Sequence, residues 1–235
     1  MAEESSRFAK DLVLEAHAWA SDYVQKAYQE PLRGESFVRW LRSMMWREYK
    51  FNDWFIKEIH LLSDDLHDIR YSLSLQIHDE FRHSRVFSRR LRELGEDGEL
   101  MTYRPTESEW YHYRHTLDWD HPAAIAASGH CCGEVLLSVL LRHMVHPKHP
   151  LVDEVTAQMI EEYVMETDKN SEQGYVDERT AELLSREVIP DEGPHIRNGR
   201  MIIERLATSD DIQALCREAF EKKRESLQNV YAGSH

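Results

Sequence analysis

The chain has 235 residues, 41% of them hydrophobic, and a formal net charge of −14 at pH 7. This length can bury one substantial core, so we expect a single domain over residues 1–235, and the acidic balance argues against a nucleic-acid surface, which is normally basic. No apolar run approaches the length of a membrane-spanning helix and the N-terminus lacks the features of a signal peptide, so we expect a cytoplasmic protein with no membrane partner.

Apolar residues recur at helical spacing through most of the chain, with few glycines and prolines to interrupt them. The expected helices cover residues 5–29, 35–63, 64–94, 122–145, 150–173, 177–206 and 210–230. Residues 96–118 are rich in polar side chains, and we expect a crossover connection there, with room for a short helix. The last helix is amphipathic, and we expect it to pack outside the core. The predicted fold class is all-α, with core helices over about residues 35–94 and 120–206.

The second expected helix carries one acid, Glu48, on its apolar stripe. We expect Asp64 and Asp65 to cap the third helix and Gly95 to end it. Glu48 lies about 16 residues before the turn between these two helices, and Glu80 lies about 16 after it. At the same rise per residue, both carboxylates reach a similar depth in an antiparallel helix pair.

A short pattern occurs twice: residues 79–83 read Asp-Glu-Phe-Arg-His, and residues 191–195 read Asp-Glu-Gly-Pro-His. A Glu and a His three residues apart point from one face of a helix. The chain has four Asp-Glu dipeptides and 14 His, so about 0.24 such matches are expected by chance, and two are present. A third Glu-x-x-His, from Glu109 to His112, lacks the preceding Asp and lies in a polar segment. We therefore set it aside.

Glu134 is the only acid in the expected helix 122–145. An unpaired carboxylate in such an apolar helix is costly, so it needs a cation or a proton, and Glu134 is a candidate metal ligand. The second motif lies in the helix that Asp177 is expected to cap. Pro190 and Pro194 should kink or locally unwind that helix, since each proline removes a backbone donor.

The two motifs resemble those of the ferritin-like di-iron carboxylate proteins. This group includes ribonucleotide reductase small subunits, soluble methane and toluene monooxygenase hydroxylases, and aldehyde-deformylating oxygenases. Its pattern is a lone Glu, then Asp/Glu-Glu-x-Arg-His, then the same pair again. Residues 79–83 match at every specified position, whereas the second copy has Pro194 in place of Arg. Over residues 35–206 the resemblance implies a ferritin-like four-helix bundle core with additional flanking helices.

The resemblance also implies two metal ions with three protein ligands each. These ligands are Glu48, Glu80 and His83 for one ion, and Glu134, Glu192 and His195 for the other. Glu80 and Glu192 would bridge the ions and lie closest to the chemistry. Asp79 and Asp191 would orient the ligand histidines across the bundle through their distal nitrogens. Carboxylates favour high oxidation states, and one imidazole per metal leaves positions open for O2 and substrate.

The spacing before the second motif leaves open which residue is the fourth carboxylate ligand. The lone Glu of this family usually precedes its motif by about 30 residues, and the first lone Glu here precedes Glu80 by 32. Glu134 precedes Glu192 by 58 residues, whereas Glu162 precedes it by 30. The helix that carries Glu162 is studded with acids, as a solvated face is. We favour Glu134 and keep Glu162 as the alternative.

The function implied by the resemblance is that of an O2-dependent oxygenase or oxidase. Two iron ions, or one manganese and one iron ion, would support hydroxylation, desaturation, N-oxygenation or cleavage of a small organic substrate. We expect an apolar substrate pocket lined by residues such as Met44, Phe51, Phe87 and Leu137. No Gly-rich dinucleotide fingerprint is present, so electrons would come from an external donor or from the substrate. The chain does not fix the substrate or the oligomeric state, and a homodimer is one option.

Three other interpretations remain. The first is a ferritin-like or rubrerythrin-like protein that handles iron or peroxide, although the three cysteines cannot form a four-cysteine rubredoxin module. The second is a non-catalytic helical interaction protein with a relict site. The third is a heme-oxygenase-like di-iron architecture, in which Glu48 would lie away from the metal.

Overall fold

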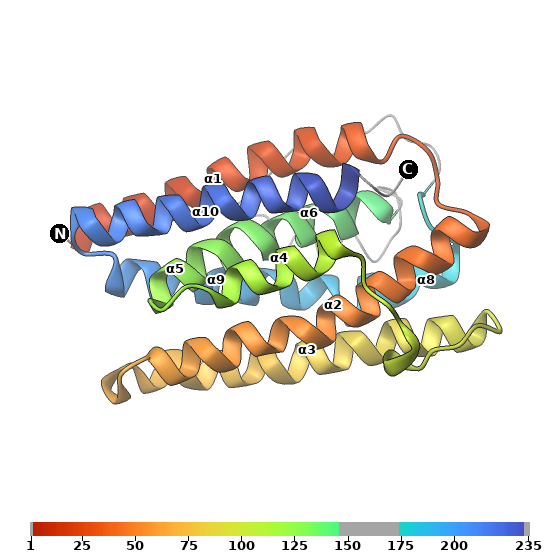
Figure 1. Cartoon of the computed structure of the whole chain (residues 1–235), viewed down its shortest axis with the longest axis horizontal. Helices are drawn as coiled ribbons and strands as arrows, with labels where there is room; N and C mark the ends of the chain where they lie inside the picture. Colours follow the sequence, from red (N-terminus) through yellow and green to blue (C-terminus); the bar gives the residue numbers. More distant parts are fainter. Residues whose placement is uncertain (1, 146–173, 233–235) are drawn as a thin grey trace.

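The computed structural model describes residues 2–145 and 174–232, and every regular element in these ranges is a helix (Figure 1). In chain order these are α1 (Ala2–Ala27), α2 (Gly34–Leu61), η1 (Asp64–Leu66), α3 (His67–Glu93), η2 (Leu100–Thr102), α4 (Glu107–Leu117), α5 (Pro122–Ser128), η3 (Gly129–Glu134), α6 (Val135–Met144), α8 (Glu178–Glu187), α9 (Ile189–Leu206) and α10 (Asp210–Ala232). The all-α prediction is confirmed for the described residues. The helix expected over residues 150–173 lies outside them.

Helices α2 and α3 form an antiparallel hairpin that packs along its full length (Figure 1). Asp64 and Asp65 lie in the short η1 turn, and Leu66 occupies the N-cap position of α3 without a side-chain hydrogen bond. The prediction that these two acids cap α3 is therefore wrong. Gly95 ends α3 as expected, because its φ of 80° is a conformation that glycine adopts without strain.

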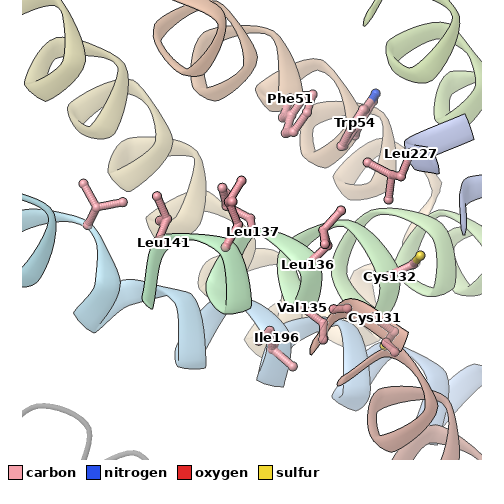
Figure 2. Packing of buried hydrophobic residues seen from close by; sticks show 14 of the residues in the cluster. Phe51, Trp54, Cys131, Cys132, Val135, Leu136, Leu137, Leu141, Ile196 and Leu227 are labelled. Carbon is pink, nitrogen blue, oxygen red and sulfur yellow. The ribbon is translucent and has the colours of Figure 1, made fainter. Parts of the chain in front are cut away.

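The apolar stretch after the crossover is one long helix with a wider turn inside it. Helices α5 and α6 are joined by η3, a π-helix that contains two glycines and ends at Glu134. The whole stretch Pro122–Met144 is long and apolar enough to cross a membrane by length and composition, so the prediction that no apolar run approaches this length is wrong. However, 89% of its most apolar window is buried, as in the core helix of a soluble protein. Figure 2 shows Leu136 and Leu137 on the side of this helix that faces Phe51 and Trp54 of α2, and Val135 on the other side, near Ile196.

The expected helix 177–206 is divided into two helices. The Asp177 side chain caps α8 by accepting a hydrogen bond of 3.1 Å from the Thr180 amide, as predicted. The chain then breaks at Val188, which has φ −124° and ψ −62°, and α9 begins with Pro190 in its first turn and Pro194 in its interior. One helix cannot continue through this point, because Pro190 has no N–H to donate to the carbonyl oxygen of Arg186, four residues earlier, and its ring crowds that carbonyl.

Helices α1 and α10 cover the side of the bundle away from the α2–α3 hairpin (Figure 1). The expectation that the last helix packs outside the core is wrong for one of its faces. Cys216, Phe220 and Leu227 of α10 are fully buried and belong to the main hydrophobic core. This face packs on α5 and α4, whose apolar residues would otherwise be exposed. The region 96–118 contains the short helix α4, in agreement with the expectation.

Candidate metal centre

The six predicted ligands come from four helical segments and are all buried. Glu48 lies on α2, Glu80 and His83 lie on α3, Glu134 ends η3, and Glu192 and His195 lie on α9. Five of the six form two groups that could each hold a metal ion. The first group is Glu48, Glu80 and His83, and the second is Glu80, Glu134 and His195; in each, the ligand atoms lie within 4.8 Å of one another.

Glu80 is the residue that the two groups share. Its Oε2 lies 3.9 Å from Nδ1 of His83, and its Oε1 lies 3.0 Å from Nδ1 of His195. Nδ1 of His83 is also 3.2 Å from Oε2 of Glu48. One carboxylate therefore presents a different oxygen to each imidazole, which is the placement that a bridge between two ions requires.

Glu192 is buried beside Glu134 but belongs to neither three-residue group. Burial and the nearby Glu134 carboxylate raise the pKa of Glu192 well above its usual range. The bridging role expected for Glu192 therefore stays a prediction, whereas Glu80 has the matching geometry.

The distal ring nitrogens face carboxylates from the opposite motif. Nε2 of His83 is 2.9 Å from Oδ2 of Asp191, and Nε2 of His195 is 3.7 Å from Oδ2 of Asp79. This is the cross-bundle pairing that the resemblance implied. With a metal ion bound, a ring N–H donated to Asp191 would fix the tautomer of His83 and leave the lone pair of Nδ1 for the ion. The contact of Asp79 is longer than a hydrogen bond, so the two halves of the site differ.

Arg82 stabilises the closer of these two pairs. Its guanidinium donates hydrogen bonds to the Asp191 carboxylate and to the backbone oxygen of Glu187. The second motif has Pro194 at the matching position, and Asp79 lies 3.5 Å from Arg82. The arginine of the first motif thus contacts the aspartates of both motifs.

Many polar atoms of the cluster form no hydrogen bond among the described residues, and this includes the two atoms of the 3.0 Å contact between Glu80 and His195, which are not aligned as a hydrogen bond. These atoms are Oε1 of Glu48, both carboxylate oxygens of Glu80, Oε2 of Glu134, both carboxylate oxygens of Glu192 and both ring nitrogens of His195. Buried carboxylates without donors are unstable unless they bind cations or protons. Two divalent cations would neutralise the four carboxylates, so the donor set fits a pair of metal ions.

The pKa values show how the cluster behaves as a proton-binding site when no metal is bound. Burial, followed by the Glu134 and Glu48 carboxylates, raises the pKa of Glu80 well above its usual range, and burial also raises the pKa of Glu134. Burial opposes a charge on His83, but its hydrogen bonds to Asp191 and Glu48 outweigh this and raise its pKa to about 9. Without metal ions, protons bound to Glu80, Glu134 and His83 therefore balance the negative charge of the cluster.

A hydrogen-bonded chain that the sequence reading missed reaches Glu134. The Asn198 amide donates to Oε1 of Gln76 over 2.9 Å, and Nε2 of Gln76 lies 3.4 Å from Oε1 of Glu134. Ser72 donates to Asn198 over 2.6 Å. Gln76 and Asn198 are buried amides that lie four residues before Glu80 and three after His195, so their helical spacing could have identified them.

A second buried acid–imidazole pair, Glu58 and His130, lies against α9. Nε2 of His130 is 2.8 Å from Oε2 of Glu58, and its Nδ1 is 3.1 Å from the backbone oxygen of His195. Gly199 permits this approach, because a Cβ atom there would lie 2.2 Å from Cβ of His130. Glu58 was not predicted from the sequence, because the apolar stripe of this helix was expected to carry one acid, Glu48.

Lys223 of α10 is fully buried, and its ammonium group lies 3.7 Å from the centre of the Trp54 ring. It donates a hydrogen bond of 2.8 Å to Thr116. Burial lowers the pKa of Lys223 well below its usual range. This residue was missed because α10 was expected to pack outside the core.

The third Glu-x-x-His of the chain has no part in the cluster. Glu109 closes a capping box with Thr106 at the start of α4, and its carboxylate accepts hydrogen bonds of 2.8 Å from Tyr103. His112 contacts Ser226 instead. Both carboxylate oxygens of Glu109 accept hydrogen bonds, whereas neither carboxylate oxygen of Glu80 does.

Glu162, the alternative to Glu134, lies outside the described residues. No protein-family model matches the chain, and neither a curated protein nor a solved structure matches it.

Proposed function

We propose that this chain is a di-iron oxygenase or oxidase that uses O2 to oxidise a small organic molecule, with a manganese and iron pair as the alternative metal content. The core would be a ferritin-like four-helix bundle of α2, α3, the α5–η3–α6 helix and α9. The observation that carries the proposal is the position of Glu80, with one carboxylate oxygen near each imidazole and a further acid beside each.

The donor set favours iron or manganese over softer metals. Four carboxylates and two imidazoles are hard or borderline donors, and the cluster contains no thiolate. Three protein ligands per ion are fewer than an octahedral ion needs, so positions remain for O2 and substrate. When bound, such a metal pair supplies the electrons that reduce O2. The two carboxylates proposed to act in the reaction are Glu80 and Glu192.

The protein residues around the ligands would orient them and exclude water. Asp191 holds the distal N–H of His83, and Gln76 lies beside Glu134. The apolar residues expected to line a substrate pocket, Met44, Phe51, Phe87 and Leu137, are all buried. Such a dry surrounding prevents reactive oxygen species from being quenched by solvent.

We propose further that electrons reach the centre from an external donor and that the protein acts in the cytoplasm. The external donor follows from the proposed reaction, since the chain has no dinucleotide fingerprint. The proposed location rests on the burial of the one helix, among the described residues, that is apolar enough to span a membrane.

The proposal can be tested by metal analysis of the purified chain after anaerobic loading with Fe(II) and removal of excess metal. We expect two iron ions per chain, and O2 consumption when a reductant is supplied. Glu80→Gln should lose both ions, because the shared carboxylate is removed. Glu109→Gln is the matched control, a buried Glu of a Glu-x-x-His pattern outside the cluster, and it should keep both ions.

Metal content below one ion per chain, or unchanged metal content in Glu80→Gln, would contradict the assignment. Loading far above two ions per chain would favour an iron-storage protein instead. Two bound ions without O2 consumption would favour a non-catalytic role.

A further inference from the structure

Glu58 and His130 connect α2 to the backbone of α9 through the interior of the bundle. Both side chains are fully buried. Nε2 of His130 lies 2.8 Å from Oε2 of Glu58, and Nδ1 of His130 lies 3.1 Å from the backbone oxygen of His195. A carbonyl oxygen only accepts hydrogen bonds, so Nδ1 of His130 carries the proton of the second bond. One imidazole therefore joins an acid of α2 to the main chain of a candidate metal ligand.

The contact of His130 with α9 lies next to the second candidate metal position. A Cβ atom at Gly199 would lie 2.2 Å from Cβ of His130, and the side chains of Glu134 and His195 belong to one group of possible metal ligands. His130 and Glu134 are four residues apart in η3, and His195 and Gly199 are four residues apart in α9. The two segments are thus antiparallel, and the contact at Gly199 lies about one helical turn from the pair Glu134 and His195.

The two candidate ligand histidines differ in how they are held. The ring of His83 is held through Nε2, which lies 2.9 Å from Oδ2 of Asp191. The same atom of His195 lies 3.7 Å from Asp79, and neither ring nitrogen of His195 forms a hydrogen bond among the described residues. The backbone oxygen of His195 contacts His130 instead. The position of His195 therefore depends on the main chain of α9 more than on its own ring.

The imidazole of His130 is enclosed on several sides. Its two nitrogens face Glu58 and the backbone oxygen of His195. The ring of Phe55 lies beside it, with the two ring centres 4.8 Å apart, and Gly199 lies against its Cβ and Cγ atoms. A ring enclosed in this way has little freedom to rotate, so it fixes the distance between η3 and α9 at this level of the bundle.

We infer that Glu58 and His130 are positioning residues for the second metal ion, the one assigned to Glu134 and His195. The inference rests on the proposed function, because it assumes a pair of metal ions. Metal ligands must lie within about 0.2 Å of their ideal distances, so a small shift of α9 away from η3 weakens the binding of this ion. The first ion should be affected little, because its ligands Glu48, Glu80 and His83 all lie in the α2–α3 hairpin.

Chelator competition with Mn(II) on the full chain tests this role. His130→Phe keeps a ring beside Phe55 but removes both nitrogens. We expect it to weaken the binding of one of the two ions at least about tenfold, as the loss of an orienting group does, and to leave the other unchanged. Anomalous scattering from crystals grown at limiting Mn(II) should show the lost ion beside Glu134 and His195.

His112→Phe is the matched control. His112 is also a buried histidine in contact with aromatic rings, with its ring centre 5.5 Å from that of Phe51, but it lies outside the cluster of candidate ligands. The same substitution there should leave the affinity for both ions unchanged. A general loss of stability after the burial of a new phenylalanine would act on both variants.

Two substitutions of Glu58 separate the position of His130 from the buried charge. In Glu58→Gln the side-chain amide can donate to Nε2 of His130 while Nδ1 keeps its bond to the His195 oxygen, so both ions should bind as in the wild type. Glu58→Ala should weaken the second ion as His130→Phe does. In the metal-free chain, the Nδ1 proton of His130 should give a slowly exchanging NMR signal in the wild type and in Glu58→Gln, and exchange faster in Glu58→Ala. These variants carry the comparison if His130→Phe does not fold.

The outcomes distinguish this inference from the proposed function. A wild-type chain that binds two ions, together with a His130→Phe variant that binds both as tightly, would overturn the inference alone. Equal weakening of both ions, or a Glu58→Gln variant that loses the second ion, would also overturn it. A wild-type chain that binds fewer than two ions would contradict the proposed function, and this inference with it.

Discussion

Asp191 lies closer to His83 than Asp79 lies to His195. Replacing each aspartate by asparagine should therefore weaken metal affinity by different amounts. Asp191→Asn keeps the shape of the side chain but removes the charged acceptor that lies 2.9 Å from Nε2 of His83. Removing such an orienting carboxylate usually weakens metal affinity by about 10–100-fold, or about 1.4–2.8 kcal/mol. Asp79→Asn should weaken it by less than about tenfold, because Asp79 is 3.7 Å from His195 and forms no hydrogen bond with it.

The assay is a chelator competition with Mn(II) or Co(II), performed on the wild type and on both variants. Metal-free protein supplies an independent readout, because the pKa of His83, raised to about 9 by Asp191 and Glu48 against the effect of burial, should fall in Asp191→Asn. NMR titration of the ring would detect this change. Equal losses of affinity in the two variants, or a larger loss in Asp79→Asn, would refute the reasoning that the closer aspartate orients its histidine more strongly.

Three further predictions concern stability and ligand identity. Gly199→Ala should lower the free energy of unfolding by about 1–3 kcal/mol in urea denaturation, because the clash with His130 outweighs the gain of up to about 1 kcal/mol in helix propensity. Lys223 should make the free energy of unfolding rise with pH by up to about 1.4 kcal/mol per unit between its lowered folded pKa and about 10.4, because the unfolded Lys223 binds a proton that the folded state does not. His83 contributes a fall up to about pH 9, so the rise is read as the difference in slope between the wild type and Lys223→Met. Lys223→Met should flatten that rise, and an unchanged slope would count against a neutral buried amine. Glu134→Gln should lose one metal ion while Glu162→Gln keeps both, and the opposite result would move the ligand to the alternative residue.

Helical periodicity was enough to predict which side chains share one face of a helix and how far along the helix they lie. The equal depth of Glu48 and Glu80 follows from counting residues along two antiparallel helices, and the structure places both near His83. The cross-bundle positions of Asp79 and Asp191 follow from the resemblance and are present. The depth of these residues can be counted from the sequence, because an α-helix has a fixed number of residues per turn and a fixed rise per residue.

Helical periodicity does not show which helices pack against each other, so features that depend on this packing were not predicted. Lys223 is polar and lies on an amphipathic helix, so its place against Trp54 became evident only from the packing of α10. The π-helix before Glu134 is a local change of hydrogen bonding that composition does not specify. Asp64 and Asp65 have the right chemistry for a cap, but the chain forms a 3₁₀ turn there first.

Anomalous scattering from a crystal of the metal-loaded chain, measured at the iron and manganese edges, tests the central claim most directly. We predict two metal peaks on either side of the Glu80 carboxylate, one beside Glu48 and His83 and the other beside Glu134 and His195. A single peak, or peaks away from Glu80, would contradict the proposed dimetal centre.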